Sequence, residues 1–118
     1  MQISNPIAKL GEEIAANYIK NKGYKIIERN FRKGYGEIDI IAVFQNTLIF
    51  VEVKTRTTAL FGGALESIAY HKLQTLIKTA RFYKMLHPKL PEALRIDAIL
   101  IDLASNNKVK NIEHIENI

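Results

Sequence analysis

The segment from Gly36 to Arg56, which reads GEIDIIAVFQNTLIFVEVKTR, constrains the fold of this chain more than any other stretch. Two apolar runs rich in Ile, Val and Phe flank a short polar break at Gln45-Asn46. These residue types favour a pleated, half-buried surface, and two such runs separated by a turn signal are typical of a β-hairpin. The sequence therefore predicts two antiparallel strands that turn at Gln45-Asn46.

Three charged residues, Asp39, Glu52 and Lys54, interrupt these apolar strands. A hairpin symmetric about Gln45-Asn46 places Asp39 directly opposite Glu52, and directly opposite residues share a face of the sheet. Lys54 lies two residues beyond Glu52, so strand alternation puts it on that face too. A slip of one residue would separate the three, so the prediction depends on this register.

A cluster of this kind has two interpretations. Two carboxylates this close repel each other unless a proton or a cation lies between them, and Mg²⁺ or Mn²⁺ prefers such oxygen ligands. A lysine beside a metal-bound phosphate can then stabilise developing charge or orient water. Alternatively, Asp39 and Glu52 simply pair with Lys54 on a solvated face of the sheet. The residues alone leave both interpretations open.

Asp39 followed by Glu52-Val53-Lys54 resembles the PD-(D/E)xK signature of restriction-endonuclease-like nucleases. A wider set of segments resembles the bacterial UPF0102 (YraN-like) family in order and spacing, over nearly the whole chain. These segments are Gly11-Glu12 with Ala15, Gly23-Tyr24, Asn30-Phe31-Arg32, Gly36 to Asp39, Phe50 to Arg56 and Ile112 to Asn117. The first signature element is Ile38-Asp39 rather than Pro-Asp, as is usual in this family.

The resemblance implies a function, because the family is classed as predicted nucleases related in fold to archaeal Holliday-junction resolvases. It implies a metal-dependent DNA endonuclease with Asp39, Glu52 and Lys54 as catalytic residues. Glu12 would join Asp39 and Glu52 as a third ligand of Mg²⁺ or Mn²⁺. Branched or junction DNA as substrate and a homodimer are implied by the same kinship. The alternative is a non-catalytic nucleic-acid-binding or protein-interaction module on the nuclease fold, since fold does not ensure function.

The first helix is predicted to begin after Asn5, with Pro6 at its first position, and to end near Gly23. From the residues alone, Glu12 and Glu13 are both solvated charges on the flanks of the apolar stripe of this helix. The resemblance selects Glu12 for the metal site and leaves Glu13 on the surface.

Three basic residues are candidates for DNA contacts. Arg32 lies near a glycine-rich turn at residues 33–36, where basic side chains either grip a DNA backbone or solvate the turn. Arg56 closes the segment that carries the nuclease signature. Lys72 lies at the edge of the apolar stripe of a helix predicted over Glu66 to Leu86, and the family often has a lysine there that approaches the phosphate.

The predicted order of elements is α-β-β-β-α-β-β, an α/β fold with a mixed sheet flanked by helices, as in the restriction-endonuclease-like core. Tyr24 to Arg32 forms the first strand, and Arg95 to Leu103 is apolar enough to be central. The residues from 109 to 118 form a terminal strand. A helical crossover after Lys54 makes two strands parallel. Asp97 either supports the site or caps a strand end.

A chain of 118 residues has the size of one domain, here 1–118. Its net charge of +5 is consistent with a polyanionic partner, although many proteins carry such a charge for solubility. The absence of Cys excludes a disulfide framework and fits the cytoplasmic location that we expect. We expect no membrane association, because no apolar run approaches the roughly 18 residues of a membrane span. The three His residues lack metal-ligand spacing.

Overall fold

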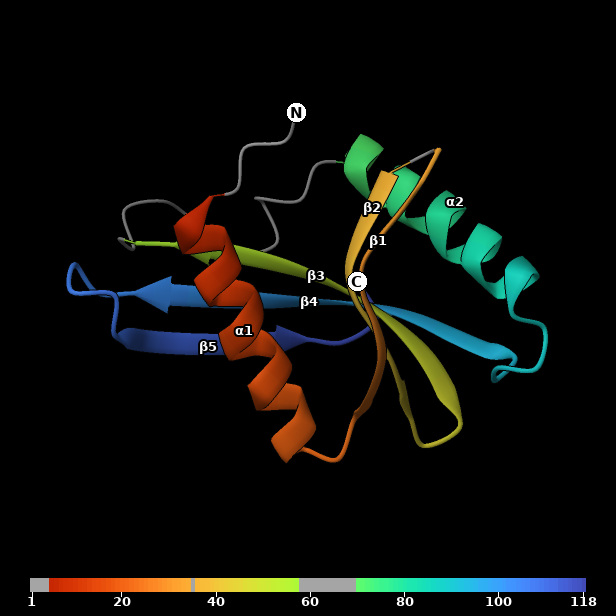
Figure 1. Cartoon of the computed structure of the whole chain (residues 1–118), viewed down its shortest axis with the longest axis horizontal. Coiled ribbons are helices and arrows are strands. Elements are labelled where there is room, and N and C mark those ends of the chain that lie inside the picture. The colour runs from red at the N-terminus through yellow and green to blue at the C-terminus, as the bar shows by residue number, and fades with distance from the viewer. Residues whose placement is uncertain (1–4, 35, 58–69) are drawn as a thin grey trace.

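The computed structural model describes residues 5–34, 36–57 and 70–118. In these residues the elements are α1 (Pro6–Asn21), β1 (Lys25–Lys33), β2 (Gly36–Phe44), β3 (Thr47–Arg56), α2 (Tyr70–Leu86), β4 (Ala93–Leu103) and β5 (Val109–Ile115). Their order confirms the predicted α/β fold, which Figure 1 shows as one sheet with two helices. The predicted loop after β3, with Phe61, and residues 66–69 of the predicted second helix lie outside the described residues.

The sheet has five strands in the order β1-β2-β3-β4-β5. The first three strands are antiparallel to one another, β3 and β4 are parallel, and β5 is antiparallel to β4. α2 lies between β3 and β4 in the chain, which confirms the predicted helical crossover after Lys54. β4 has a neighbour on each side, which explains why its sequence is almost wholly apolar.

The β2–β3 hairpin has the predicted register. Its ladder runs from Phe44 opposite Thr47 to Ile40 opposite Val51. Gln45 and Asn46 both adopt positive φ, at 49° and 61°, as a two-residue turn that matches the twist of the strands requires. Gln45-Asn46 is therefore the turn on which the positions of Asp39 and Glu52 depend.

The two helices cover opposite faces of the sheet. α1 begins where Oδ1 of Asn5 accepts hydrogen bonds from the N–H groups of Ile7 and Ala8 at 3.0 and 3.3 Å, which confirms the predicted cap. It packs on a core that includes Ile40, Val51 and Ile99. α2 packs on the other core, whose largest buried members include Phe50 and Tyr83.

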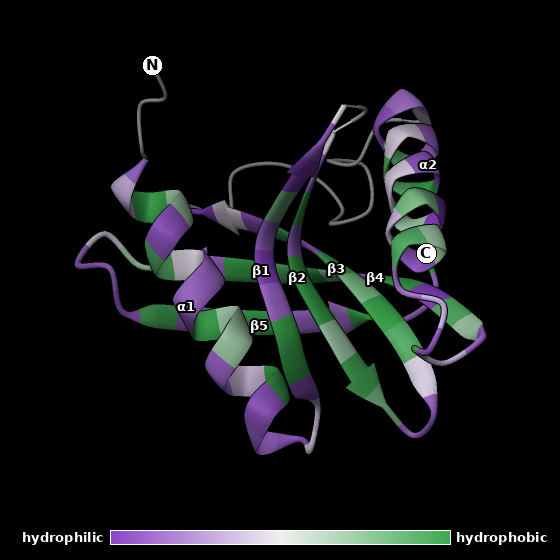
Figure 2. Ribbon diagram, turned by 45° about the vertical axis from the view of Figure 1, so that its right-hand side comes forward, coloured by the Kyte–Doolittle hydropathy of each residue, from purple (hydrophilic) through white to green (hydrophobic). Residues whose placement is uncertain are grey.

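The sheet is strongly twisted. Figure 1 shows β1 and the far part of β2 turned steeply away from β4 and β5, with α1 crossing in front of the flatter part. Figure 2 shows apolar residues concentrated along β2, β3 and β4, whereas both helices alternate between polar and apolar residues. In the described part of the chain, neither helix is long and apolar enough to cross a membrane.

Candidate functional site

Asp39 and Glu52 lie together where the β2–β3 ladder ends. The last ladder pair before them is Ile40 with Val51. Beyond it, Oδ2 of Asp39 accepts a hydrogen bond from the Val53 N–H at 2.8 Å, so a side chain takes over from the backbone ladder. The Asp39 and Glu52 residues are only 9% and 6% exposed, and their carboxyl groups share a hydrogen bond. The hairpin thus brings together the two carboxyl groups that the sequence placed opposite each other.

Burial and mutual repulsion disfavour the ionised form of Asp39 in this carboxyl pair. Burial, and then the negative charge and the hydrogen bond of Glu52, raise the pKa of Asp39 to about 8. The Val53 N–H opposes this change but does not cancel it. The direction of this shift is that expected for two acids that share one buried site.

Lys72, from the first turns of α2, reaches the same carboxyl pair. Its Nζ lies 3.1 Å from Oε2 of Glu52, and its side chain is half exposed. Burial disfavours the charge of Lys72, but the carboxyl groups of Glu52, Asp39 and Glu37 outweigh it and raise the pKa of Lys72. The lysine singled out in the sequence for a phosphate is thus paired with a predicted metal ligand.

Glu12, on α1, joins the same electrostatic cluster. Burial, and then the charges of Glu37 and Glu52, raise its pKa, while Arg29 and Arg32 oppose that change. By contrast, Glu13 has a side chain 60% exposed and pairs with Arg29, so it lies on the surface as predicted.

The close approach of α1 to β3 determines the position of Glu12. A Cβ added at Gly11 would lie 1.8 Å from Oγ1 of Thr55 on β3, a distance that real atoms do not adopt. Glycine at this position therefore lets the helix approach the strand that carries Glu52. Gly36 has a similar role for α2, since an added Cβ would lie 2.6 Å from Cγ2 of Thr75. The helices that carry Glu12 and Lys72 are both fitted closely to the hairpin.

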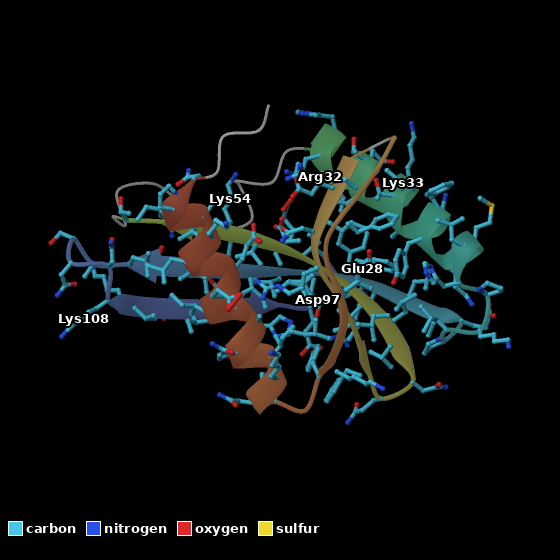
Figure 3. The ribbon with its side chains drawn as sticks, in the orientation of Figure 1. Glu28, Arg32, Lys33, Lys54, Asp97 and Lys108 are labelled. Atoms are coloured by element: carbon cyan, nitrogen blue, oxygen red, sulfur yellow. The ribbon has the colours of Figure 1, made fainter. Side chains whose placement is uncertain are left out.

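Lys54 is exposed and forms no ion pair with Asp39 or Glu52 in residues 5–34, 36–57 and 70–118. Its neighbour Thr55 faces Gly11 of α1, so strand alternation directs Lys54, which Figure 3 labels on β3, to the other face of the sheet. The interpretation in which Asp39 and Glu52 simply pair with Lys54 is therefore wrong for this structure, where Lys72 is the partner of Glu52.

The two candidate arginines have acidic partners. Nη2 of Arg32 lies 3.3 Å from Oε1 of Glu37, close enough to Glu12 to lower its pKa in part. Nε of Arg56 lies 2.7 Å from Oδ1 of Asp102, its neighbour in the parallel β3–β4 register. Arg32 thus belongs to the acidic cluster, whereas Arg56 lies at the far end of β3.

Asp97 takes part in a separate buried network that the sequence did not reveal. Arg95 contacts both of its carboxyl oxygens, at 2.8 and 2.9 Å, and Nε2 of His114 lies 2.8 Å from Oδ2. The N–H of Asn117 donates to Oδ1 at 3.0 Å. These partners lie on β4, β5 and the C-terminal tail, so Asp97 holds the end of the chain in place. In the sequence, this network is indicated by Arg95 and Asp97, two charged residues that alternate with apolar residues in one strand.

The donor set fits a hard divalent cation. Asp39 and Glu52 supply paired oxygens, and Oε2 of Glu52 is buried without a hydrogen-bond partner in the described residues, despite the nearby Lys72 ammonium. Such an atom is costly unless a cation satisfies it. No three acidic or His side chains among the described residues are arranged to hold a metal as they stand. Glu12 would therefore have to turn inward to complete a set of three.

Comparisons with known proteins identify the family of this chain. Residues 11–101 match the sequence model described as Uncharacterised protein family UPF0102. A UPF0102 protein of Alkaliphilus oremlandii is 40% identical over 98% of both chains, and one of Clostridium botulinum strain Loch Maree is 46% identical over 92% of this chain and 91% of its own. One of Caldanaerobacter subterraneus is 49% identical, over 65% of this chain and 63% of its own. The chain therefore belongs to the UPF0102 family.

Proposed function

We propose that this chain is a divalent-metal-dependent endonuclease that hydrolyses phosphodiester bonds in DNA. The observation that carries the proposal is the buried pair of Asp39 and Glu52, whose closeness and burial raise the pKa of Asp39. A strongly perturbed acid with a specific charged neighbour is a candidate for a functional site. The pair also lies on the residues that match the PD-(D/E)xK signature, with Lys54 two residues beyond Glu52.

The three carboxylates would hold Mg²⁺ or Mn²⁺. Asp39 and Glu52 supply the buried oxygens, and Glu12 supplies a third from α1. The Val53 N–H, 2.8 Å from Asp39, fixes the orientation of that carboxylate. Bound here, the metal supplies an activated water and charge stabilisation for the leaving oxygen. Asp39 would hold the cation in its ionised form, because the charge of a cation neutralises the repulsion between the two carboxylates.

Lys54 would act on the substrate rather than on the carboxylates. It is exposed and lies on the strand that carries Glu52. Its ammonium can therefore orient the attacking water or neutralise the charge that develops on the scissile phosphate.

Basic side chains would position the DNA backbone. Lys72 contacts Glu52 of the carboxyl pair, Arg32 pairs with the nearby Glu37, and Arg56 lies at the far end of β3. A net charge of +5 favours a polyanion in general terms. Branched DNA as the substrate, and a homodimer as the active form, follow from the likeness to junction resolvases.

One observation favours a second candidate, a non-catalytic nucleic-acid-binding module. The described acidic side chains are not arranged to hold a metal without movement of Glu12. In that case DNA binding would depend on salt, would ignore divalent cations and would survive the loss of Glu52 and Lys54.

Calorimetric titration with Mn²⁺ tests the proposal. We expect saturable binding by the wild type, its loss in Asp39→Asn and in Glu52→Gln, and its retention in Glu13→Gln, whose side chain points to solvent. The proteins that bind metal are then tested on linear, flapped and four-way DNA. Metal-independent DNA binding without Mn²⁺ binding or cleavage by the wild type would replace the nuclease with the binding module.

A further inference from the structure

We propose that the ammonium group of Lys72 and the divalent cation occupy the carboxyl site in turn, so that metal binding releases Lys72 to contact a DNA phosphate. This inference rests on the proposed metal site, and it assigns Lys72 a role that changes during the reaction. In the metal-free protein the lysine neutralises Glu52. In the loaded protein it becomes a ligand of the substrate.

The geometry of the ion pair supports an exchange. Nζ of Lys72 lies 3.1 Å from Oε2 of Glu52, within reach of an ion pair. That same oxygen is buried and lacks a properly directed hydrogen bond among the described residues. The ammonium therefore compensates the charge of Glu52 without satisfying its hydrogen-bonding capacity. A cation that coordinates the oxygen directly would do both.

The charges around Lys72 favour its replacement. Three acids act on its ammonium, namely Glu52, Asp39 and Glu37. One positive charge cannot compensate all of them. A divalent cation carries twice the charge and can bridge both buried carboxylates. A bound cation would repel the ammonium at close range. It would also neutralise the negative charge that attracts Lys72 to the site.

The side chain of Lys72 has room to rotate, whereas the side chain of Glu52 is enclosed by the core. The Lys72 side chain is 51% exposed, but the Glu52 side chain is only 7% exposed. Lys72 belongs to α2 and Glu52 to β3, so the contact joins two elements by a flexible, unbranched side chain. Rotation of this side chain toward solvent moves the ammonium away from Glu52 while the helix stays in place. A phosphate near the metal is the natural new partner.

The exchange predicts effects of opposite sign from one substitution. Lys72→Gln removes the competitor of the metal, so Mn²⁺ should bind more tightly. The same change removes a phosphate contact, so DNA should bind more weakly. Loss of a lysine that only supports the fold, or that binds DNA away from the carboxyl pair, would not tighten metal binding. Lys78→Gln is the matched control, because Lys78 is an exposed lysine on the same helix.

The test is calorimetric titration of wild type, Lys72→Gln and Lys78→Gln with Mn²⁺ in the absence of DNA. We expect Lys72→Gln to bind about two- to five-fold more tightly, the range that corresponds to a partly exposed ion pair, and Lys78→Gln to match the wild type. The lysine ammonium groups of ¹⁵N-labelled protein can also be followed by NMR during titration with Mg²⁺. One ammonium signal should shift, and that signal should be missing from the spectrum of Lys72→Gln. In the presence of Mg²⁺, Lys72→Gln should bind a 20-base-pair DNA duplex more weakly than the wild type does. The slope of its log affinity against log salt concentration should be smaller by about one unit.

The outcomes separate this inference from the proposed function. Saturable Mn²⁺ binding that is unchanged or weaker in Lys72→Gln, yet abolished by Glu52→Gln, would overturn the exchange and leave the metal site intact. If none of the proteins binds Mn²⁺, the proposed function fails and the exchange fails with it. Tighter Mn²⁺ binding by Lys72→Gln, with Lys78→Gln unchanged, supports both the proposed metal site and the exchange.

Discussion

Nε2 of His114 lies 2.8 Å from Oδ2 of Asp97, and neither side chain is more than 3% exposed. Arg95 contacts both oxygens of the same carboxylate, and the Asn117 N–H donates to it as well. Burial alone would raise the pKa of Asp97, but the hydrogen bonds from His114, Arg95 and Asn117 outweigh it and lower that pKa. A buried, ionised carboxylate thus joins β4, β5 and the C-terminal tail.

Asp97→Asn should therefore destabilise the fold strongly. It leaves the Arg95 guanidinium without its buried counter-charge, which typically costs about 3 kcal/mol or more. We expect the unfolding midpoint to fall by about 10 °C, with Mn²⁺ binding retained in the folded protein. Thermal unfolding measures the fall of the midpoint, and urea unfolding measures the loss of free energy. The control is Asp102→Asn, whose partner Arg56 is partly exposed and which should cost less than about 1 kcal/mol. Equal losses in both variants would contradict a special role for Asp97.

Asp39→Asn should stabilise the metal-free protein as the pH rises. Because the folded-state pKa of Asp39 is about 8, against 3.8 for the ordinary group, the folded state binds the proton more tightly. The stability contributed by this group is complete below pH 4 and is lost as the pH rises through 8. Asparagine carries no such charge. Thermal unfolding in chelator should show the advantage of Asp39→Asn growing by several °C from pH 5 to pH 9, and a constant difference would contradict the raised pKa.

The hairpin could be predicted from the sequence because all of its determinants are local. Strand alternation fixes which residues share a face, and Gln45-Asn46 accepts the positive φ that the turn demands. Once the turn is placed, the register follows, and with it the meeting of Asp39 and Glu52. The start of α1 at Asn5-Pro6 was predictable for the same reason, since capping depends on neighbouring residues.

The partners of the charged side chains could not be predicted, because they depend on packing between distant elements. Lys72 meets Glu52 only because α2 lies against the hairpin face, and Arg56 meets Asp102 only because the crossover sets the β3–β4 register. The network around Asp97 likewise requires β5 to lie beside β4. A single sequence gives the spacing within each element, but it does not give the distance between them. For this reason the sequence did not reveal that Lys72 of α2, rather than Lys54 of the same strand, pairs with Glu52.

Gly11→Ala should weaken both the fold and the metal site. The added Cβ would meet Oγ1 of Thr55 at 1.8 Å, so α1 must shift away from β3. Overpacking of this kind costs about 1–3 kcal/mol, and the shift also withdraws Glu12 from the other carboxylates. Thr55→Ala removes the nearest clashing atom, so the double variant should lose less stability than the sum of the single variants. Urea unfolding of the four proteins gives this coupling, and additive losses would contradict the close approach.

Lys54→Gln should separate catalysis from metal binding. The ammonium of Lys54 is exposed and touches neither Asp39 nor Glu52 in the described residues, so its loss should leave the Kd for Mn²⁺ nearly unchanged. Removing a group that stabilises transition-state charge lowers kcat by about 10²- to 10³-fold. Single-turnover cleavage of the DNA selected in the substrate screen measures the rate. Lys25→Gln is the control, because Lys25 is also an exposed strand lysine, at the start of β1, and carries no proposed role. A similar small loss in both variants would mean that Lys54 contributes only general positive charge to DNA binding, and the assignment of a catalytic role to it would be wrong.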